Sequence, residues 1–116
     1  MLRYLIILLI FFDHVNSSKP KLSEFHKTHS QNHHSKFKIL CTAQEGTKPL
    51  SFVWFFNHTR IDNRTNNHKN IRIEDFEDES ILRIDRLERQ NSGNYSCQVE
   101  NIDGQDVQSS ILLVKG

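Results

Sequence analysis

Apolar and polar residues alternate along most of the chain after Lys36, with the period of two that is typical of half-buried β-strands. These runs recur roughly every ten residues between polar turns, and the helical period is nearly absent. The runs that we expect to form strands are Phe37–Cys41, Leu50–Phe56, Ile71–Ile73, Ser80–Ile84, Tyr95–Val99 and Gln105–Val114. Their number and spacing predict an all-β sandwich of two packed antiparallel sheets.

The same alternation predicts which side chains face the core. If Cys41 points inward, Phe37 and Ile39 share its face. The other positions that we expect to face inward are Phe52, Trp54, Leu82, Ile84, Tyr95, Cys97, Val99, Leu112 and Val114. Asn101–Gly104 predicts a hairpin turn in which Gly104 takes a positive φ. The segment 19–36 is polar, rich in histidine and poorly patterned, and only its first part, around Leu22 and Phe25, suggests an edge strand.

The N-terminal residues predict an export signal. Leu5–Phe12 is an unbroken apolar run that follows Arg3, and the small residues Val15 and Ser17 suit signal peptidase. The run is far shorter than the roughly 20 apolar residues that a transmembrane helix needs, and a buried N-terminal strand is the alternative. We therefore predict a signal peptide at 1–17, one domain at 18–116, and no membrane insertion within this chain.

The two cysteines and the small net charge narrow the class further. An exported chain with two cysteines most simply forms one disulfide, here Cys41 to Cys97, worth about 4 kcal/mol in the chain-entropy account. Two thiols that bind a metal with histidines are the alternative. The formal net charge of +1 gives no electrostatic reason to expect nucleic-acid binding. These features predict a protein that is secreted or forms the extracellular part of a cell-surface receptor.

Two spacings specify the sandwich more closely. Trp54 follows Cys41 by 13 positions, on the next expected strand, where its ring can fill the layer beside an inter-sheet disulfide. Tyr95 stands two residues before Cys97, so both point inward, and its hydroxyl can reach the backbone a few residues upstream as a tyrosine corner. With Leu82, these two aromatic residues are the predicted hallmarks of the core.

These residues carry a resemblance to I-set immunoglobulin domains, and the resemblance covers nearly all of residues 19–116. The signature L-x-I-x-x-L…D-x-G-x-Y-x-C with its tail N-x-x-G…L-x-V is matched by Leu82, Ile84, Leu87, Gly93, Tyr95, Cys97, Asn101, Gly104, Leu112 and Val114. Asn91 stands where the signature has an aspartate. The resemblance therefore implies a neutral hydrogen bond from Asn91, with Arg72 as the candidate partner, in place of the usual ion pair.

Two shorter segments, Pro20–Phe25 and Gly46–Trp54, are similar to immunoglobulin domains of the arthropod Down syndrome cell adhesion molecule family. That resemblance implies cell-surface recognition by self-binding within multidomain receptors. The function that we expect is extracellular protein–protein recognition, including homophilic binding, in cell adhesion or self-recognition. The alternative is a soluble, secreted single-domain immune or decoy protein that binds a foreign ligand.

Three N-x-S/T triplets, at Asn57, Asn63 and Asn94, predict N-glycosylation. All three are expected on the same sheet, which large glycans would obstruct. The outward residues of the opposite sheet form the tentative protein-binding face: Lys38, Leu40, Arg72, Glu74, Ile81 and Arg83. Leu40 and Ile81 would be its apolar centre with charges at the rim, although scattered surface apolar residues are common and are the alternative.

Charge is separated along the chain in a way that suits self-association. Residues 18–48 hold six lysines and two glutamates, net +4, whereas residues 74–79 hold five acids, net −5. An antiparallel homodimer could set one patch against the other. The acidic run could also hold calcium, but a solvated turn is the simpler interpretation.

Enzymatic and metal chemistry have little support in the sequence. The chain has no G-x-S-x-G, H-E-x-x-H or glycine-rich phosphate loop, so we predict that it is not an enzyme and needs no cofactor. Four histidines, His26, His29, His33 and His34, crowd the segment before Phe37. The first two have a ligand-like spacing, but zinc needs three or four convergent ligands, so we interpret all four as solvated loop residues and predict no metal site.

Overall fold

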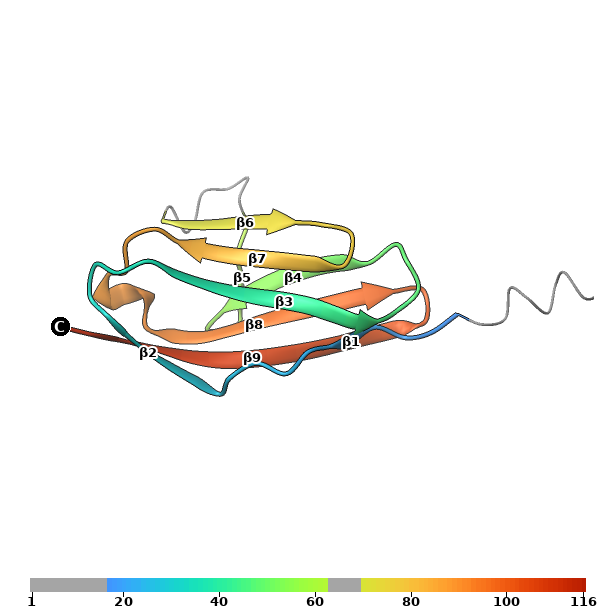
Figure 1. Cartoon of the computed structure of the whole chain (residues 1–116), viewed down its shortest axis with the longest axis horizontal. Helices are drawn as coiled ribbons and strands as arrows, with labels where there is room; N and C mark the ends of the chain where they lie inside the picture. The colour runs from blue at the N-terminus through green and yellow to red at the C-terminus, as the bar shows by residue number, and fades with distance from the viewer. Residues whose placement is uncertain (1–16, 63–69) are drawn as a thin grey trace, which may run out of the picture.

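The computed structural model describes residues 17–62 and 70–116, which form two packed β-sheets (Figure 1). The strands are β1 (Lys21–Leu22), β2 (Thr28–Asn32), β3 (Phe37–Glu45), β4 (Ser51–Phe56), β5 (Thr59–Arg60), β6 (Ile71–Asp75), β7 (Glu79–Ile84), β8 (Gly93–Asn101) and β9 (Gly104–Lys115), with a short 3-10 helix η1 (Arg89–Asn91) before β8. The sheets have the orders β1-β3-β7-β6 and β2-β9-β8-β4-β5. The predicted all-β sandwich is thus confirmed.

The predicted signal peptide falls almost wholly outside the described residues, and the division at Ser17 stays a prediction. Within residues 17–62 and 70–116, no helix is long and apolar enough to cross a membrane.

The predicted disulfide joins the two sheets. Cys41 on β3 and Cys97 on β8 are bonded and fully buried. Phe37 and Ile39 lie inward on the same strand as Cys41, as the alternation predicts. Trp54 is the direct cross-strand neighbour of Cys97 and is 1% exposed, so its ring fills the layer beside the disulfide.

The polar atom of the Trp54 ring has a partner in the core. The Trp54 indole Nε1 donates a hydrogen bond to Ser80 Oγ at 2.8 Å, and the Trp54 ring stacks on Phe25 with centroids 6.2 Å apart. Leu82, the third predicted hallmark, is fully buried. A buried donor without an acceptor would cost about 1–3 kcal/mol, so Ser80 helps to stabilise the buried position of the Trp54 indole.

The tyrosine corner is present, but the neighbouring polar pair differs from the expectation. The Tyr95 hydroxyl donates to the Asn91 carbonyl oxygen at 2.6 Å, and burial raises the pKa of Tyr95 well above its ordinary value. The Asn91 side chain pairs with Asn70, whose Nδ2 donates to Asn91 Oδ1 at 2.8 Å. The expected partner, Arg72, instead pairs with Asp85. An amide pair is suited to this site because each amide can donate and accept at once.

The histidine-rich segment is more ordered than its sequence suggests. Residues Thr28–Asn32 form β2, which pairs with β9 in parallel, so the sheets are not antiparallel throughout. Before it, Leu22 is buried in β1, which pairs with β3 and confirms the expected edge strand. The period-two rule missed β2 because its side chains are polar and half exposed, so backbone pairing to the β9 edge forms the strand.

The expected hairpin joins β8 to β9. Gly104 has φ +156°, and Asn101 Oδ1 accepts hydrogen bonds from the backbone N–H of Asp103 at 2.8 Å and of Gly104 at 3.1 Å. The Asn101 amide also donates to the Ser18 carbonyl oxygen at 2.8 Å, which ties the start of the domain to this turn. Both predicted features of the turn are confirmed.

Candidate protein-binding faces

The six residues of the predicted binding face come together on the outer side of the four-stranded sheet. Strand pairing places them in two rows across β3, β7 and β6, one of Lys38, Arg83 and Arg72 and one of Leu40, Ile81 and Glu74. The sequence therefore placed these side chains on a common face correctly. The capacity of this face to bind a protein depends on how exposed these side chains are and on which charges are already paired.

Exposure corrects one of these residues. Leu40 is 46% exposed, as expected, but Ile81 is only 8% exposed. Ile81 lies on a central strand with Leu40 and Glu74 directly opposite on the two neighbouring strands, and side chains of this length can shield it from solvent. Strand parity therefore gave its face correctly and its exposure wrongly. The apolar centre of this face shrinks to Leu40.

The charges of this face are largely paired within it. Arg83 Nε donates to Glu74 Oε1 at 2.6 Å, and an Arg72 guanidinium nitrogen donates to Asp85 Oδ1 at 2.8 Å. The hydrogen bond to Asp85 and the carboxylate charge raise the pKa of Arg72. These pairs already use charges that would otherwise be available to a partner.

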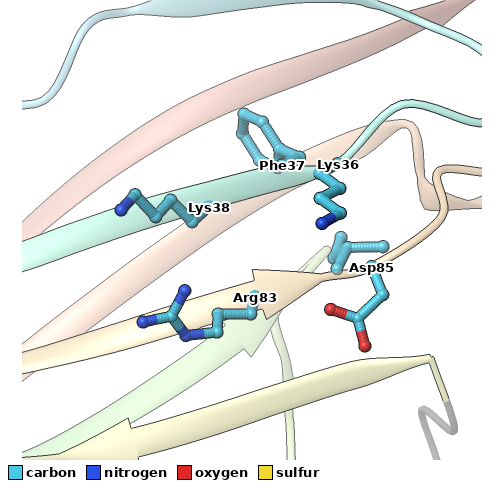
Figure 2. A pocket seen from close by; sticks show the side chains of 6 residues that line it. Lys36, Phe37, Lys38, Arg83 and Asp85 are labelled. Carbon is cyan, nitrogen blue, oxygen red and sulfur yellow. The ribbon is translucent and has the colours of Figure 1, made fainter.

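An open depression of about 300 Å³ lies at one end of this face. Figure 2 shows Lys38 and Arg83 beside each other on neighbouring strands, with Asp85 close by. The depression is lined by Lys36, Phe37, Lys38, Arg83, Ile84 and Asp85. Like charges directly across strands repel each other, so Glu74 and Asp85 reduce the electrostatic repulsion within the row of Lys38, Arg83 and Arg72.

A second surface, on the outer side of the five-stranded sheet, was missed by the sequence analysis. Val107, Ile111 and Leu113 point outward from β9 and are 45%, 46% and 50% exposed. We call these three residues the β9 stripe. The alternation in Gln105–Val114 contained this signal, because three of the five outward positions there are apolar, against two of the five inward ones. The sequence analysis assigned only the inward residues of this segment, Leu112 and Val114.

The neighbours of the β9 stripe are short or uncharged. Asn94 on β8 lies opposite Ile111, and Gln98 lies opposite Val107. On the other side, β2 contributes Thr28 opposite Ile111 and Ser30 opposite Leu113. These small side chains leave the stripe uncovered. An exposed apolar row with a polar, uncharged surround resembles the centre of a protein interface.

Two of the three predicted glycosylation sites can be placed, and Asn63 lies outside the described residues. Asn94 lies on β8 and Asn57 lies in the turn between β4 and β5, so both are on the side of the five-stranded sheet, as expected. Asn57 sits in the tight turn between β4 and β5 with φ +48°, and its Oδ1 accepts a hydrogen bond from the Asn94 backbone N–H at 2.9 Å. A Cβ on Gly93 would come within 2.7 Å of that oxygen, so glycine is required for this contact. Glycan occupancy stays a prediction.

Histidines and acids are also rearranged relative to the sequence expectations. His26 and His29, which have the ligand-like spacing, meet edge to face with ring centroids 5.7 Å apart. By contrast, His33, His34 and Glu88 bring one ligand-type atom each within 4.8 Å of one another. The sequence could not show this group, because Glu88 is 55 positions from His33.

Comparison with known proteins agrees with this architecture. Residues 19–101 match the family model of the immunoglobulin domain. The membrane-bound isoform of pro-neuregulin-1 from Homo sapiens is 32% identical over 95 residues, which are 82% of this chain and 14% of that protein. Cell adhesion molecule Dscam1 of Drosophila melanogaster is 32% identical over 79 residues, 66% of this chain and 4% of that protein. The chain thus spans a small part of the curated relatives that it matches.

Solved structures give the same result. The crystal structure of the Dscam1 Ig7 domain, isoform 5, superposes with a TM-score of 0.75 at 25% identity, covering 84% of this chain and 97% of that one. Titin domain M7, at 22% identity and a TM-score of 0.73, covers 86% of this chain and 97% of that one and supports the fold alone. The resemblance to Dscam immunoglobulin domains is confirmed. The chain belongs to the immunoglobulin-domain family.

Proposed function

We propose that this chain is an extracellular recognition domain that binds protein, and that it binds a second copy of itself in cell adhesion or self-recognition. The family supports the general role, since immunoglobulin domains commonly bind proteins, and Dscam1 is by name a cell adhesion molecule. The Cys41–Cys97 disulfide is consistent with an oxidising, extracellular compartment. The predicted signal peptide is consistent with the same location.

The observation that carries the proposal is the β9 stripe. Its three apolar side chains are each about half exposed and stand on one face of one strand. The outward residues of β9 between its ends are all uncharged: Gln105, Val107, Ser109, Ile111 and Leu113. Two such faces can pack without desolvating a charge along the stripe, which would cost several kcal/mol for each unpaired ion. The stripe therefore favours burial against a second apolar surface.

Self-pairing is favoured by the charges at the two ends of this face. Glu100 is exposed beside Gln105 at one end, and Lys115 is exposed at the other. In an antiparallel two-fold arrangement, Glu100 of one copy would approach Lys115 of the second copy, and the reverse contact would form by symmetry. The antiparallel homodimer expected from the sequence is thus kept in this proposal, with the contact moved to the five-stranded sheet. This contact requires chain in which Asn94 carries no glycan, because Asn94 lies directly opposite Ile111.

The outer face of β3, β7 and β6 is less suited to the same role. Its apolar centre is Leu40 alone, and four of its charges form the pairs Arg83–Glu74 and Arg72–Asp85. A partner would have to displace or match these pairs. This face provides the natural control in any test.

Sedimentation equilibrium from micromolar to near-millimolar protein tests the proposal. The chain is produced in an oxidising host without glycosylation, beside the variant Ile111→Glu, Leu113→Glu and the matched variant Leu40→Glu. We expect the wild type and Leu40→Glu to dimerise and the β9 variant to stay monomeric. A wild type that is monomeric throughout would reject self-binding, and loss of dimer in Leu40→Glu alone would move the contact to the other sheet.

A further inference from the structure

A cluster of metal-ligand side chains lies at the end of the sandwich where the turn after β2 meets the turn before η1. The Nε2 atom of His33 is 3.1 Å from Glu88 Oε2, and the Nε2 atom of His34 is 3.8 Å from the same oxygen. All three ligand-type atoms lie within 4.8 Å of one another. We propose that His33, His34 and Glu88 bind a divalent transition metal ion, with Zn²⁺ as the best match.

The distances are close to those that the ion requires. Zn²⁺ bonds to histidine nitrogen and carboxylate oxygen are about 2.0–2.1 Å long, so tetrahedral ligand atoms lie roughly 3.3 Å apart. The two imidazole rings lie with centroids 3.6 Å apart and their planes tilted by 32°, and both Nε2 atoms lie near one carboxylate oxygen. Closing from the observed separations of up to 4.8 Å to this spacing requires a movement of the side chains, which the more exposed ring, His34, is freer to make.

The backbone holds the ligands in place before any ion arrives. The His33 backbone N–H donates to the Lys115 carbonyl oxygen at 2.6 Å, and that of His34 donates to the Leu87 carbonyl oxygen at 2.8 Å. The Glu88 N–H donates to Asn91 Oδ1 at 2.8 Å. Ligands on pinned backbone lose less conformational entropy on binding, and preorganisation of this kind raises affinity.

The charges around the cluster allow a cation. Arg86 Nε lies 3.4 Å from Glu88 Oε1, so the arginine pairs with one carboxylate oxygen and leaves Oε2 for the ion. The hydrogen bond to Glu88 uses a proton on His33 Nε2, and an ion bound at that nitrogen would displace this proton. The side chains of His33, His34 and Glu88 are 30%, 45% and 34% exposed, so water can complete the coordination.

The ligand types select the metal. Two imidazoles and one carboxylate suit Zn²⁺ and related ions such as Cu²⁺ or Ni²⁺, whereas Ca²⁺ and Mg²⁺ prefer sites made entirely of oxygen. Binding would connect the turn at 33–35 to the turn at 85–88. An ion held only by the folded chain stabilises it by mass action, so the unfolding temperature would rise with Zn²⁺ concentration.

Isothermal titration of Zn²⁺ into the purified full chain, without a histidine tag and after chelator treatment, tests the site. The variants are His34→Asn, which tolerates the φ of +71° at that position, and Glu88→Gln. We expect one saturable site in the wild type and, in each variant, an affinity weaker by roughly tenfold or more. A parallel thermal scan should show a Zn²⁺-dependent rise in unfolding temperature that both variants lose.

His26→Asn is the matched control, because His26 and His29 have the spacing that sequence reasoning singles out. This variant should bind Zn²⁺ as the wild type does. Absence of saturable binding in the wild type, or binding that survives His34→Asn and Glu88→Gln but is lost in His26→Asn, would overturn the proposal. Because dimerisation is measured separately, failure of this site would leave the recognition proposal standing.

Discussion

The outer faces of the two sheets follow the same strand alternation, but their outward isoleucines differ in how far they are exposed to solvent. On the four-stranded sheet, outward Ile81 is flanked by the long side chains of Leu40 and Glu74 and is 8% exposed. On the five-stranded sheet, outward Ile111 is flanked by Asn94 and Thr28 and is 46% exposed. Two isoleucines of equal size and parity therefore differ because of the length of their cross-strand neighbours. Strand parity assigns a face, and neighbours decide exposure.

The largest expected effect comes from shortening these two isoleucines. Ile81→Ala should reduce the free energy of unfolding by about 2–4 kcal/mol, because it removes buried methyl groups and leaves a cavity. Ile111→Ala should change it by less than about 0.5 kcal/mol, because its side chain is largely in water. Urea unfolding followed by tryptophan fluorescence measures both. Equal losses in the two variants would contradict the assigned difference in burial.

The second largest effect should come from a glycan on Asn94, which should weaken self-association. Asn94 lies directly opposite Ile111, so an attached sugar would cover the β9 stripe. In chain from a glycosylating host, Asn94→Gln should tighten dimerisation by roughly tenfold or more, about 1.4 kcal/mol. The substitution should have little effect on unglycosylated chain. Sedimentation that is unchanged despite occupied Asn94, checked by mass spectrometry, would argue against this face.

Mild acid should lower the stability of the fold through His29 on β2, and this effect should be smaller. Burial, and then the neighbouring His26, lower the pKa of His29 below its ordinary 6.5. The unfolded chain therefore takes up this proton at higher pH than the folded chain, so stability is complete above about pH 6.5 and is lost as pH falls through the folded pKa.

His29→Asn should therefore flatten the fall in unfolding temperature below pH 6.5. A substitution on the other sheet, Arg83→Gln, should leave the shape of this profile unchanged. The measurement is a thermal scan at a series of pH values. A His29→Asn profile that runs parallel to the wild type would show that this histidine is not the group concerned.

Reversing the charges at the ends of the face should give the smallest effect. Lys115→Glu should weaken dimerisation by a few fold, since an exposed ion pair contributes about 0.2–1 kcal/mol and is screened by salt. Adding Glu100→Lys to the same chain should restore the wild-type affinity. Failure of the double variant to recover would indicate that the two-fold axis does not bring these ends together.

Much of the core was predictable because it depends on local spacing. Tyr95 stands two residues before Cys97 on one strand, and Trp54 follows Cys41 by 13 positions on the next strand. Alternation then decides which way each side chain points. The partner of Asn91 was not predictable. Asn70 and Arg72 are only two positions apart in the sequence, and the geometry of the chain around them decides that Asn70 pairs with Asn91 and Arg72 with Asp85.

The functional surfaces were harder to predict for a related reason. The exposure of Ile81 depends on the side chains of two other strands, and the meeting of His33, His34 and Glu88 depends on two turns far apart in sequence. The strand β2 has no apolar pattern of its own and is specified by the edge of β9. Alternation along one segment carries no information about such contacts.

The measurement that tests the β9 face most directly is a concentration series of methyl NMR spectra on the unglycosylated chain. The methyl groups of Val107, Ile111 and Leu113 should shift progressively toward near-millimolar concentration, while those of Leu40 and Ile81 stay unchanged. That result would place the contact on the β9 stripe. Shifts confined to Leu40 and its surroundings, or no shift at any methyl group, would contradict the account.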